Sequence, residues 1–149
     1  MLFKAKSLMT EDELNDTIIT HDHQWVTGNL IVDGNLAVIT GGIIEMNDEY
    51  LSHEWWTVVD RHTVGQDTGL TDKNETPIFE KDWVRYVFTD LHGKSTVYDV
   101  PVTYDDRMAC IAGGWLLSGI CQDCEIIPGV HDLDTYTAWK NQQPEEPNT

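Results

Sequence analysis

Short apolar runs separated by turn residues recur along the chain, and this pattern predicts a mainly β protein. Two such runs, 30–32 and 36–39, flank Asp33-Gly34, a pair that is typical of a type I′ hairpin turn. Segment 55–59 is dense in aromatic and β-branched residues, so it predicts another strand. The N-terminal half is therefore expected to be built from strands and tight turns.

A second hairpin is predicted further along the chain. Segments 82–88 and 95–102 are joined by residues 90–94, in which Gly93 is expected to adopt a left-handed conformation. The apolar residues of the second strand recur at every second position: Tyr98, Val100 and Val102. This spacing is typical of a strand with one half-buried face.

Two short helices are predicted from their capping residues. Thr10 and Glu13 have the spacing of a capping box, which would begin a helix that ends before Thr17. Asp132 can cap a second helix, in which three apolar residues form a stripe: Leu133, Tyr136 and Trp139. That stripe is expected to pack on its own subunit or on a neighbouring one.

These elements predict the fold class and its boundaries. We expect a mainly β protein with small twisted sheets or a partly open β-barrel, SH3-like character in the C-terminal half, and one or two short helices. Residues 1–143 are expected to form one domain, with two lobes, about 1–62 and 63–143, as the alternative. Residues 144–149 have no apolar side chain, so we expect a disordered tail.

A turn-rich passage between the two hairpins has a recognisable order. Residues 63–84 read T-V-G-Q-D-T-G-L-T-D-K-N-E-T-P-I-F-E-K-D-W-V. This resembles the T-V-G-Q-x-T-G-L-x-D-K-N-G-x-x-I-x-E-G-D-x-V signature of the YopX-like proteins of phages and prophages. Residues 2–6, 25–30 and 125–132 are similar to other blocks of that family, in the same order. Glu75 and Lys81 stand where the signature has Gly.

The resemblance implies a small β domain to which no activity is generally attached. From the residues themselves, Asp72 can accept backbone hydrogen bonds in an Asx-turn, and Asn74 can adopt a positive φ. If Asp72 only shapes this turn, its replacement by Ala should cost about 0.5 to 2 kcal/mol. The alternative interpretation is that the passage forms part of a binding surface.

The charge of the chain restricts its partners. The formal net charge is −17, and eleven acidic residues but no Lys or Arg lie between residues 7 and 60. Such a chain is not expected to bind nucleic acid or an anionic membrane directly. A basic host protein is a candidate partner, and mimicry of a nucleic acid is another interpretation. The acidic excess can also serve solubility alone.

No apolar run is long enough to span a bilayer, and the sequence shows no basic segment followed by the apolar segment of a secretory signal. Three cysteines are too few for a disulfide framework. We therefore expect a soluble protein in the cytoplasm of a bacterial host.

Three groups of residues are candidates for chemistry. The first could bind zinc and consists of Cys110, Cys121, Cys124 and His131, although free buried thiols are the alternative. The second is His21-Asp22-His23, which could contribute to a metal-dependent hydrolase if a third ligand is supplied. The third, Asp67-Thr68-Gly69, matches the loop of retroviral-type aspartic proteases in only three letters. None of them predicts a cofactor or a catalytic residue.

Six tryptophans are many for a small β protein, and some should face an interface or a cleft. If Trp55 and Trp56 lie in a strand, they point to opposite faces. The candidate binding surface is Trp55, Trp56, Gln66, Asp67, Thr68 and Asp72. Our leading hypothesis is a non-enzymatic accessory protein that forms homo-oligomers and binds a host macromolecule or a small metabolite. A nucleic-acid mimic that inhibits a host DNA-binding or defence protein, and a metal-dependent hydrolase, are the alternatives.

Overall fold

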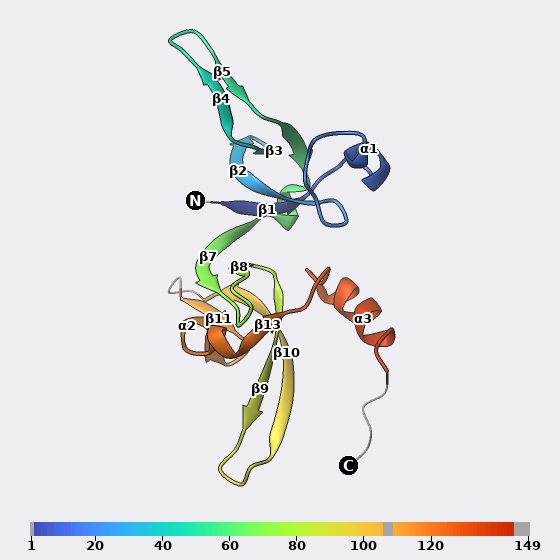
Figure 1. Ribbon diagram of the computed structural model, residues 1–149, viewed down its shortest axis with the longest axis vertical. Coiled ribbons are helices and arrows are strands. Elements are labelled where there is room, and N and C mark those ends of the chain that lie inside the picture. Colours follow the sequence, from blue (N-terminus) through green and yellow to red (C-terminus); the bar gives the residue numbers. More distant parts are fainter. Residues whose placement is uncertain (1, 106–108, 145–149) are drawn as a thin grey trace. The chain divides into compact units, whose positions relative to one another are not determined.

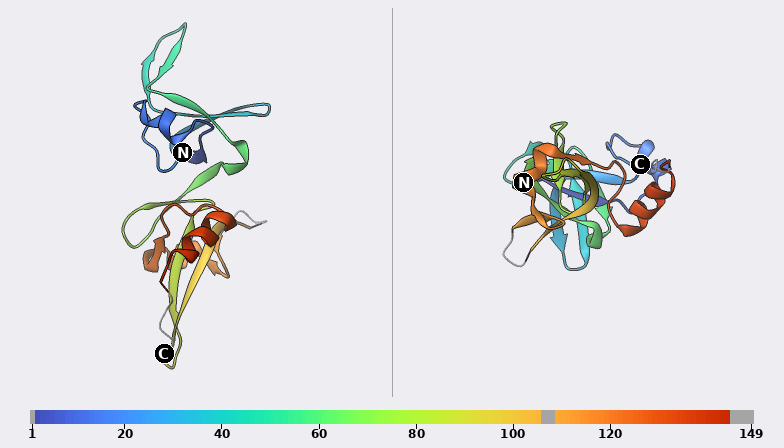
Figure 2. Two further views of the ribbon diagram at one scale, coloured as in Figure 1. Left: turned by 90° about the vertical axis from the view of Figure 1, so that its right-hand side faces the viewer. Right: turned by 90° about the horizontal axis from the view of Figure 1, so that it is seen from below.

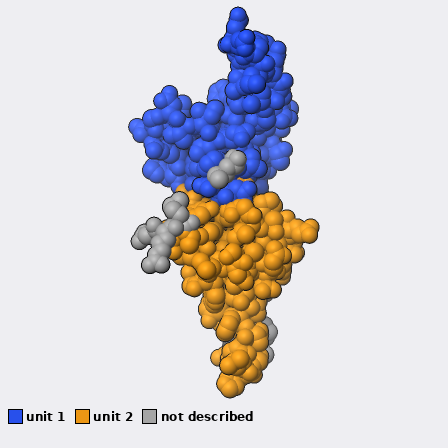
Figure 3. All heavy atoms as spheres, turned by 90° about the vertical axis from the view of Figure 1, so that its left-hand side faces the viewer, with its two compact units in different colours: residues 1–67 blue, residues 68–149 orange. Residues whose placement is uncertain are grey.

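The computed structural model describes residues 2–105 and 109–144 (Figure 1). The chain divides into two compact units, residues 1–67 and 68–149, coloured separately in Figure 3. Both units are built mainly from antiparallel strands, and the described strands form open sheets, with no closed barrel among them. The predicted mainly β fold with small sheets and short helices is therefore confirmed.

The described part of the first unit contains one α-helix, one 3-10 helix and several strands. In chain order these elements are β1 (Phe3–Lys6), α1 (Glu11–Asn15), β2 (Trp25–Asp33), β3 (Leu36–Thr40), β4 (Ile43–Met46), β5 (Leu51–His53), β6 (Trp56–Val59) and the 3-10 helix η1 (Arg61–Thr63). Strand β7 (Gly65–Thr71) begins in this unit and continues into the second. The sheet of the first unit has the order β6-β3-β2-β1-β7. Its core comprises Ala5, Leu14, Ile19, Val26, Ala37, Ile39 and Val59.

The hairpin between β2 and β3 differs from the sequence prediction in its turn. Asp33 pairs with Leu36, so the two loop residues are Gly34 and Asn35 rather than Asp33 and Gly34. Gly34 has a φ of 59°, and Asn35 is not among the residues with positive φ. A type I′ turn needs positive φ at both central residues, whereas type II′ needs it at the first alone. The predicted hairpin is present, but its two loop residues lie one position later than predicted. The predicted type I′ turn is wrong, because only the first loop residue has a positive φ.

The second unit has a five-stranded sheet with the order β12-β11-β10-β9-β13. Its elements are β8 (Pro77–Phe79), β9 (Trp83–Thr89), β10 (Ser95–Tyr104), β11 (Cys110–Ala112), β12 (Trp115–Leu116), α2 (Leu117–Ile120), η2 (Cys121–Asp123), β13 (Cys124–Ile126) and α3 (Leu133–Asn141). The β9–β10 hairpin is confirmed, and Gly93 in its loop has the expected positive φ of 81°. The core includes Ile78, Val84, Val102 and Leu117.

Both predicted helices are present with their caps. Thr10 and Glu13 form the capping box of α1, and Asp132 forms one with Thr135 at the start of α3. Helix α2 was not predicted, because no side chain caps its first turn and the sequence therefore carries no start signal. Most of the expected disordered tail, residues 145–149, lies outside the described residues.

Helix α3 lies along the sheet of its own unit, as Figure 2 shows from two further directions. The Tyr136 ring stacks on the Trp83 ring with centroids 4.4 Å apart. Two residues of the predicted stripe, Tyr136 and Trp139, thus pack within the subunit, whereas Leu133 is 67% exposed. No helix among the described residues is long and apolar enough to cross a membrane.

Candidate functional site

Trp55 directly precedes β6, and Trp56 is the first residue of that strand, so the two tryptophans do not share a strand as the sequence predicted. Trp55 is half buried and packs against the core of the first unit. Gly41 lies beneath its indole ring, because a Cβ at that position would be 2.6 Å from Trp55 Nε1. Trp56 is 64% exposed. The two indoles therefore line two different hollows of the first unit.

The exposed indole belongs to an apolar hollow of about 420 Å³, which we call the Trp56 hollow. Its apolar lining residues are Leu8, Met9, Ile19, Trp56 and Val58, and Glu13 and Thr17 contribute polar groups. Leu8 and the neighbouring Ile18 are themselves 65% and 72% exposed. An exposed Trp beside other apolar residues is typical of a protein interface, because indoles are enriched where binding energy is concentrated.

The second hollow, of about 470 Å³, is more polar and contains Trp25 and Trp55. Lys4, Thr20, His21, Asp22 and Thr27 line the rest of this Trp25–Trp55 hollow. Indoles together with hydroxyl, imidazole and charged groups suit a small ligand with a flat ring and a polar edge. The sequence indicated Trp55 and His21 separately and gave no sign that they would share a hollow.

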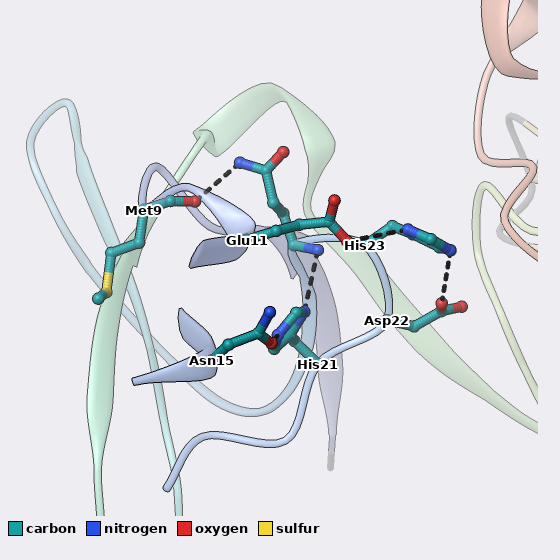
Figure 4. A network of polar contacts seen from close by, with 7 residues as sticks. Met9, Glu11, Asn15, His21, Asp22 and His23 are labelled. Atoms are coloured by element: carbon teal, nitrogen blue, oxygen red, sulfur yellow. Dashed lines mark hydrogen bonds and ion pairs between the residues drawn. The ribbon is translucent and has the colours of Figure 1, made fainter. Parts of the chain in front are cut away.

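The histidine loop beside this hollow forms a hydrogen-bonded network (Figure 4). His21 Nδ1 accepts a hydrogen bond from the Gln24 backbone N–H at 3.3 Å, so its Nε2 carries the proton and donates to Asn15 Oδ1 at 2.7 Å. His23 contacts two carboxylates, Glu11 Oε1 at 2.9 Å and Asp22 Oδ1 at 3.8 Å. The two imidazoles thus have separate polar partners and do not converge.

The metal hypotheses gain no support from this geometry. No group of three or more His, Cys, Asp or Glu side chains that could hold an ion occurs among the described residues. Cys121 and Cys124 are buried in the core of the second unit, and Cys110 packs against that core. Burial raises the pKa of the Cys110 thiol and of the Cys124 thiol to about 11. The three thiols are free, and those of Cys121 and Cys124 are buried.

The other residues of the candidate binding surface form contacts within the fold. Gln66 pairs with Phe3 between β7 and β1, and the Asp67 backbone N–H donates to Leu2 O at 2.9 Å. The Thr68 hydroxyl donates to Ile78 O at 2.6 Å and accepts from the Leu70 N–H at 3.2 Å. Gln66, Asp67 and Thr68 thus have structural contacts, and their part in a binding surface stays a prediction.

Asp72 is buried, with 2% of its surface exposed, and its carboxylate accepts three backbone hydrogen bonds. Oδ1 accepts from the N–H groups of Asn74 and Thr76, and Oδ2 accepts from the Ile126 N–H at 3.0 Å. The prediction that Asp72 accepts backbone hydrogen bonds in an Asx-turn is confirmed. The prediction of a positive φ at Asn74 is wrong, because the residue with positive φ, 63°, is Glu75. Asp72 thus joins the signature turn to β13.

A polar cluster that sequence reasoning missed connects α3 to the sheet of the second unit. Arg85 binds Asp99 through two hydrogen bonds of 2.8 and 3.0 Å, and the Tyr136 hydroxyl donates to the same carboxylate. Burial alone would raise the pKa of Asp99, but the bonds from Arg85 and Tyr136 outweigh it and hold that pKa below its ordinary value of 3.8. The Arg85 guanidinium also lies 5.2 Å from the Trp139 ring centroid.

We compared the chain with known families, proteins and structures. The model of one family, described as YopX protein, matches residues 7–127, which include the signature passage at residues 63–84. Searches of curated proteins and of solved structures found no match. The match covers well over half of the sequence, so the resemblance seen in the signature is confirmed. The chain belongs to the YopX protein family.

Proposed function

We propose that this protein is a non-enzymatic phage or prophage accessory protein that acts in the bacterial cytoplasm as a self-associating binding module. The Trp56 hollow carries the proposal. It combines a 64% exposed indole with Leu8, Met9, Ile19 and Val58 in an open depression of about 420 Å³. Fully burying a large apolar side chain contributes about 1.5 to 3 kcal/mol, so a second subunit that covers this depression gains stability.

The Trp25–Trp55 hollow gives the same unit a place for a small ligand with a polar edge. Ligand binding and self-association thus use two different depressions in this proposal. The nucleic-acid mimic is less favoured, because two of the four acidic residues in and beside α1 serve local contacts. Glu13 completes the capping box, and Glu11 binds His23. The hydrolase alternative would need a third metal ligand beside His21 and His23.

Sedimentation velocity at micromolar concentration tests self-association. The wild-type protein is expected to sediment at a multiple of its 17.0 kDa mass. Trp56→Ser is expected to sediment as a monomer with an unchanged far-UV spectrum. Leu91→Ser is the matched control, because Leu91 is fully exposed on the β9–β10 loop, and it should leave the oligomer intact. A monomeric wild-type protein would contradict the proposal.

A further inference from the structure

A β-ribbon extends beyond the sheet of the first unit. The pairing of β3 with β6 ends at Thr40 and Trp56, but the hydrogen-bonded ladder continues past it. The Gly41 N–H donates to Trp55 O at 2.8 Å, and the Glu54 N–H donates to Gly42 O at 2.7 Å. Strands β4 and β5 then pair from Ile43 and His53 onward. We call residues 43–53 the arm, and Figure 1 shows it as the ribbon formed by β4 and β5.

The arm has two backbone edges that other strands could extend. Within the described residues, β4 and β5 form a two-stranded sheet and pair with each other alone. A two-stranded hairpin has little stability of its own in water. Addition of an extended chain to such an edge forms a regular backbone ladder, which is a common mode of peptide recognition.

Large apolar side chains cover the arm without a core beneath them. All four residues of β4 are exposed. The exposed large apolar residues are Ile43, Ile44, Met46, Tyr50 and Leu51, with exposures of 56%, 67%, 71%, 49% and 48%. In a monomeric soluble protein such a concentration of apolar side chains marks an interaction surface. The arm therefore has both the backbone edge and the apolar contacts that a docked strand requires.

The tip of the arm is already ordered by its own hydrogen bonds. Asn47 Oδ1 accepts from the N–H groups of Glu49 and Tyr50, and the Asn47 N–H donates to Tyr50 O at 3.0 Å. The Tyr50 hydroxyl donates to Glu45. A preformed ribbon loses less conformational freedom when it binds than a flexible loop would lose.

The charge of the arm decides which partner fits it. Residues 43–54 include four exposed acidic residues and no Lys or Arg: Glu45, Asp48, Glu49 and Glu54. Three of these residues lie in the arm itself, so two arms from two copies would bring six carboxylates together, and like charges opposite each other in a sheet are destabilising. The first unit as a whole has 12 acidic residues against Lys4, Lys6 and Arg61. A second copy is thus a poor occupant of the arm.

We propose that the arm is a docking strand for a basic partner protein, which adds an edge strand of alternating cationic and apolar residues to β4 or β5. The apolar residues of that strand cover the exposed side chains of the arm, and its Lys or Arg side chains face the carboxylates of Glu45, Asp48 and Glu49. This surface is distinct from the Trp56 hollow. The inference therefore does not depend on self-association.

Fluorescence anisotropy with two labelled decapeptides tests the proposal on the full-length protein. One peptide alternates Lys and Val, and the other has five Lys residues followed by five Val residues. The two have the same charge, so diffuse attraction to a chain of net charge −17 affects both. The alternating peptide is expected to bind at least tenfold more tightly and to slow hydrogen exchange of amides in residues 43–53. Equal affinities would overturn the proposal.

Paired variants locate the binding surface. The double variant Ile44→Thr/Met46→Thr keeps the charge and the strand propensity of the arm, and it is expected to weaken binding of the alternating peptide at least tenfold. The matched control is Ile31→Thr/Leu36→Thr in the β2–β3 hairpin, where both residues are 50% exposed. That control should change the affinity by less than twofold. An arm variant that binds like the wild-type protein would contradict the proposal.

Sedimentation of the same variants separates this inference from the proposed function. The arm variant should retain the oligomer of the wild-type protein, and Trp56→Ser should lose the oligomer but retain peptide binding. If the arm variant becomes monomeric, a second copy occupies the arm and the basic-partner proposal is wrong. If no protein self-associates but the arm still selects the alternating peptide, the proposed self-association is wrong and the inference stands.

Discussion

Residues 72–76 and 90–94 form the same turn in two different surroundings. In the first, the Asp72 N–H donates to Thr76 O, and Asp72 Oδ1 accepts from the N–H groups two and four positions later. In the second, the Asp90 N–H donates to Lys94 O, and Asp90 Oδ1 accepts from the corresponding pair. The fourth residue has a positive φ in both, 63° at Glu75 and 81° at Gly93.

The surroundings give the two carboxylates different roles. Asp72 is 2% exposed, and its second oxygen reaches the Ile126 N–H in β13. The Lys73 N–H adds a bond to Cys124 O at 2.9 Å, and the Lys73 ammonium lies 3.3 Å from the Glu125 carboxylate. The 90–94 turn is a hairpin loop whose neighbours are exposed. The comparison indicates that the signature turn of this family member is an internal tie between two segments, whereas the second turn only reverses the chain.

The largest expected difference between the turns is in their contribution to stability. Asp72→Ala leaves three backbone N–H groups without their acceptor, of which those of the exposed Asn74 and Thr76 can bind water, whereas Ile126 is half-buried. The two local bonds contribute about 1 kcal/mol and an unsatisfied buried donor costs about 1 to 3 kcal/mol, so we expect a loss of about 2 to 4 kcal/mol. Urea denaturation measures the free energy of unfolding of both variants. Asp90→Ala is the matched control, with an expected loss of about 1 kcal/mol. Equal losses would mean that the bond to Ile126 contributes nothing.

The second prediction concerns the residue with positive φ in each turn. A left-handed conformation costs a non-glycine residue about 1 to 2 kcal/mol, whereas glycine adopts it freely. Glu75→Gly should therefore raise the free energy of unfolding by about 0.5 to 1 kcal/mol. Gly93→Ala should lower it by about 1 kcal/mol, since a Cβ there would contact nothing within 4 Å and only the backbone is strained. Thermal unfolding of both variants measures these opposite changes in stability. Changes of the same sign would contradict the assigned cost of a positive φ at these two positions.

Hydrogen exchange of single amides distinguishes the two turns without a mutation. The Ile126 N–H is bound to a buried carboxylate, so it should exchange only when much of the second unit opens. The His92 N–H is bound to Asp90 in an exposed loop and should exchange through local fraying. We expect protection at least 100-fold greater at Ile126 than at His92 by NMR. Similar protection would show that the signature turn opens independently of the sheet.

The smallest expected effect is a loss of stability at alkaline pH, caused by ionisation of the Cys124 thiol beside the signature turn. Burial, then the charges of Cys121, Asp123 and Asp72, raise the pKa of the Cys124 thiol from 9.0 to about 11. The protonated thiol therefore stabilises the fold below pH 9, and this contribution disappears as the pH rises toward 11. Urea midpoints of the wild-type protein should fall over this interval more than those of Cys124→Ala. Parallel curves would contradict the role assigned to burial.

Features that depend on near neighbours along the chain could be predicted from the residue types. Thr10 and Asp132 cap their helices through residues three positions away, and the Gly93 loop closes within five residues. Such contacts need no other part of the chain, so the residue types alone predict them. The family signature also lies within one continuous passage, and it could therefore be recognised without a fold.

The burial of side chains and their long-range contacts depend on tertiary packing and could not be predicted from the sequence. Asp72 binds Ile126, which is 54 residues away, and Tyr136 reaches Asp99 across 37 residues. The same holds for the register that moved the first hairpin turn to Gly34-Asn35, and for Trp55 being covered while Trp56 stays exposed. These outcomes depend on pairing between distant segments. Local propensity hardly distinguishes one strand register, or one buried side chain, from its neighbour. The free energy gained by burial and by long-range hydrogen bonds selects among them.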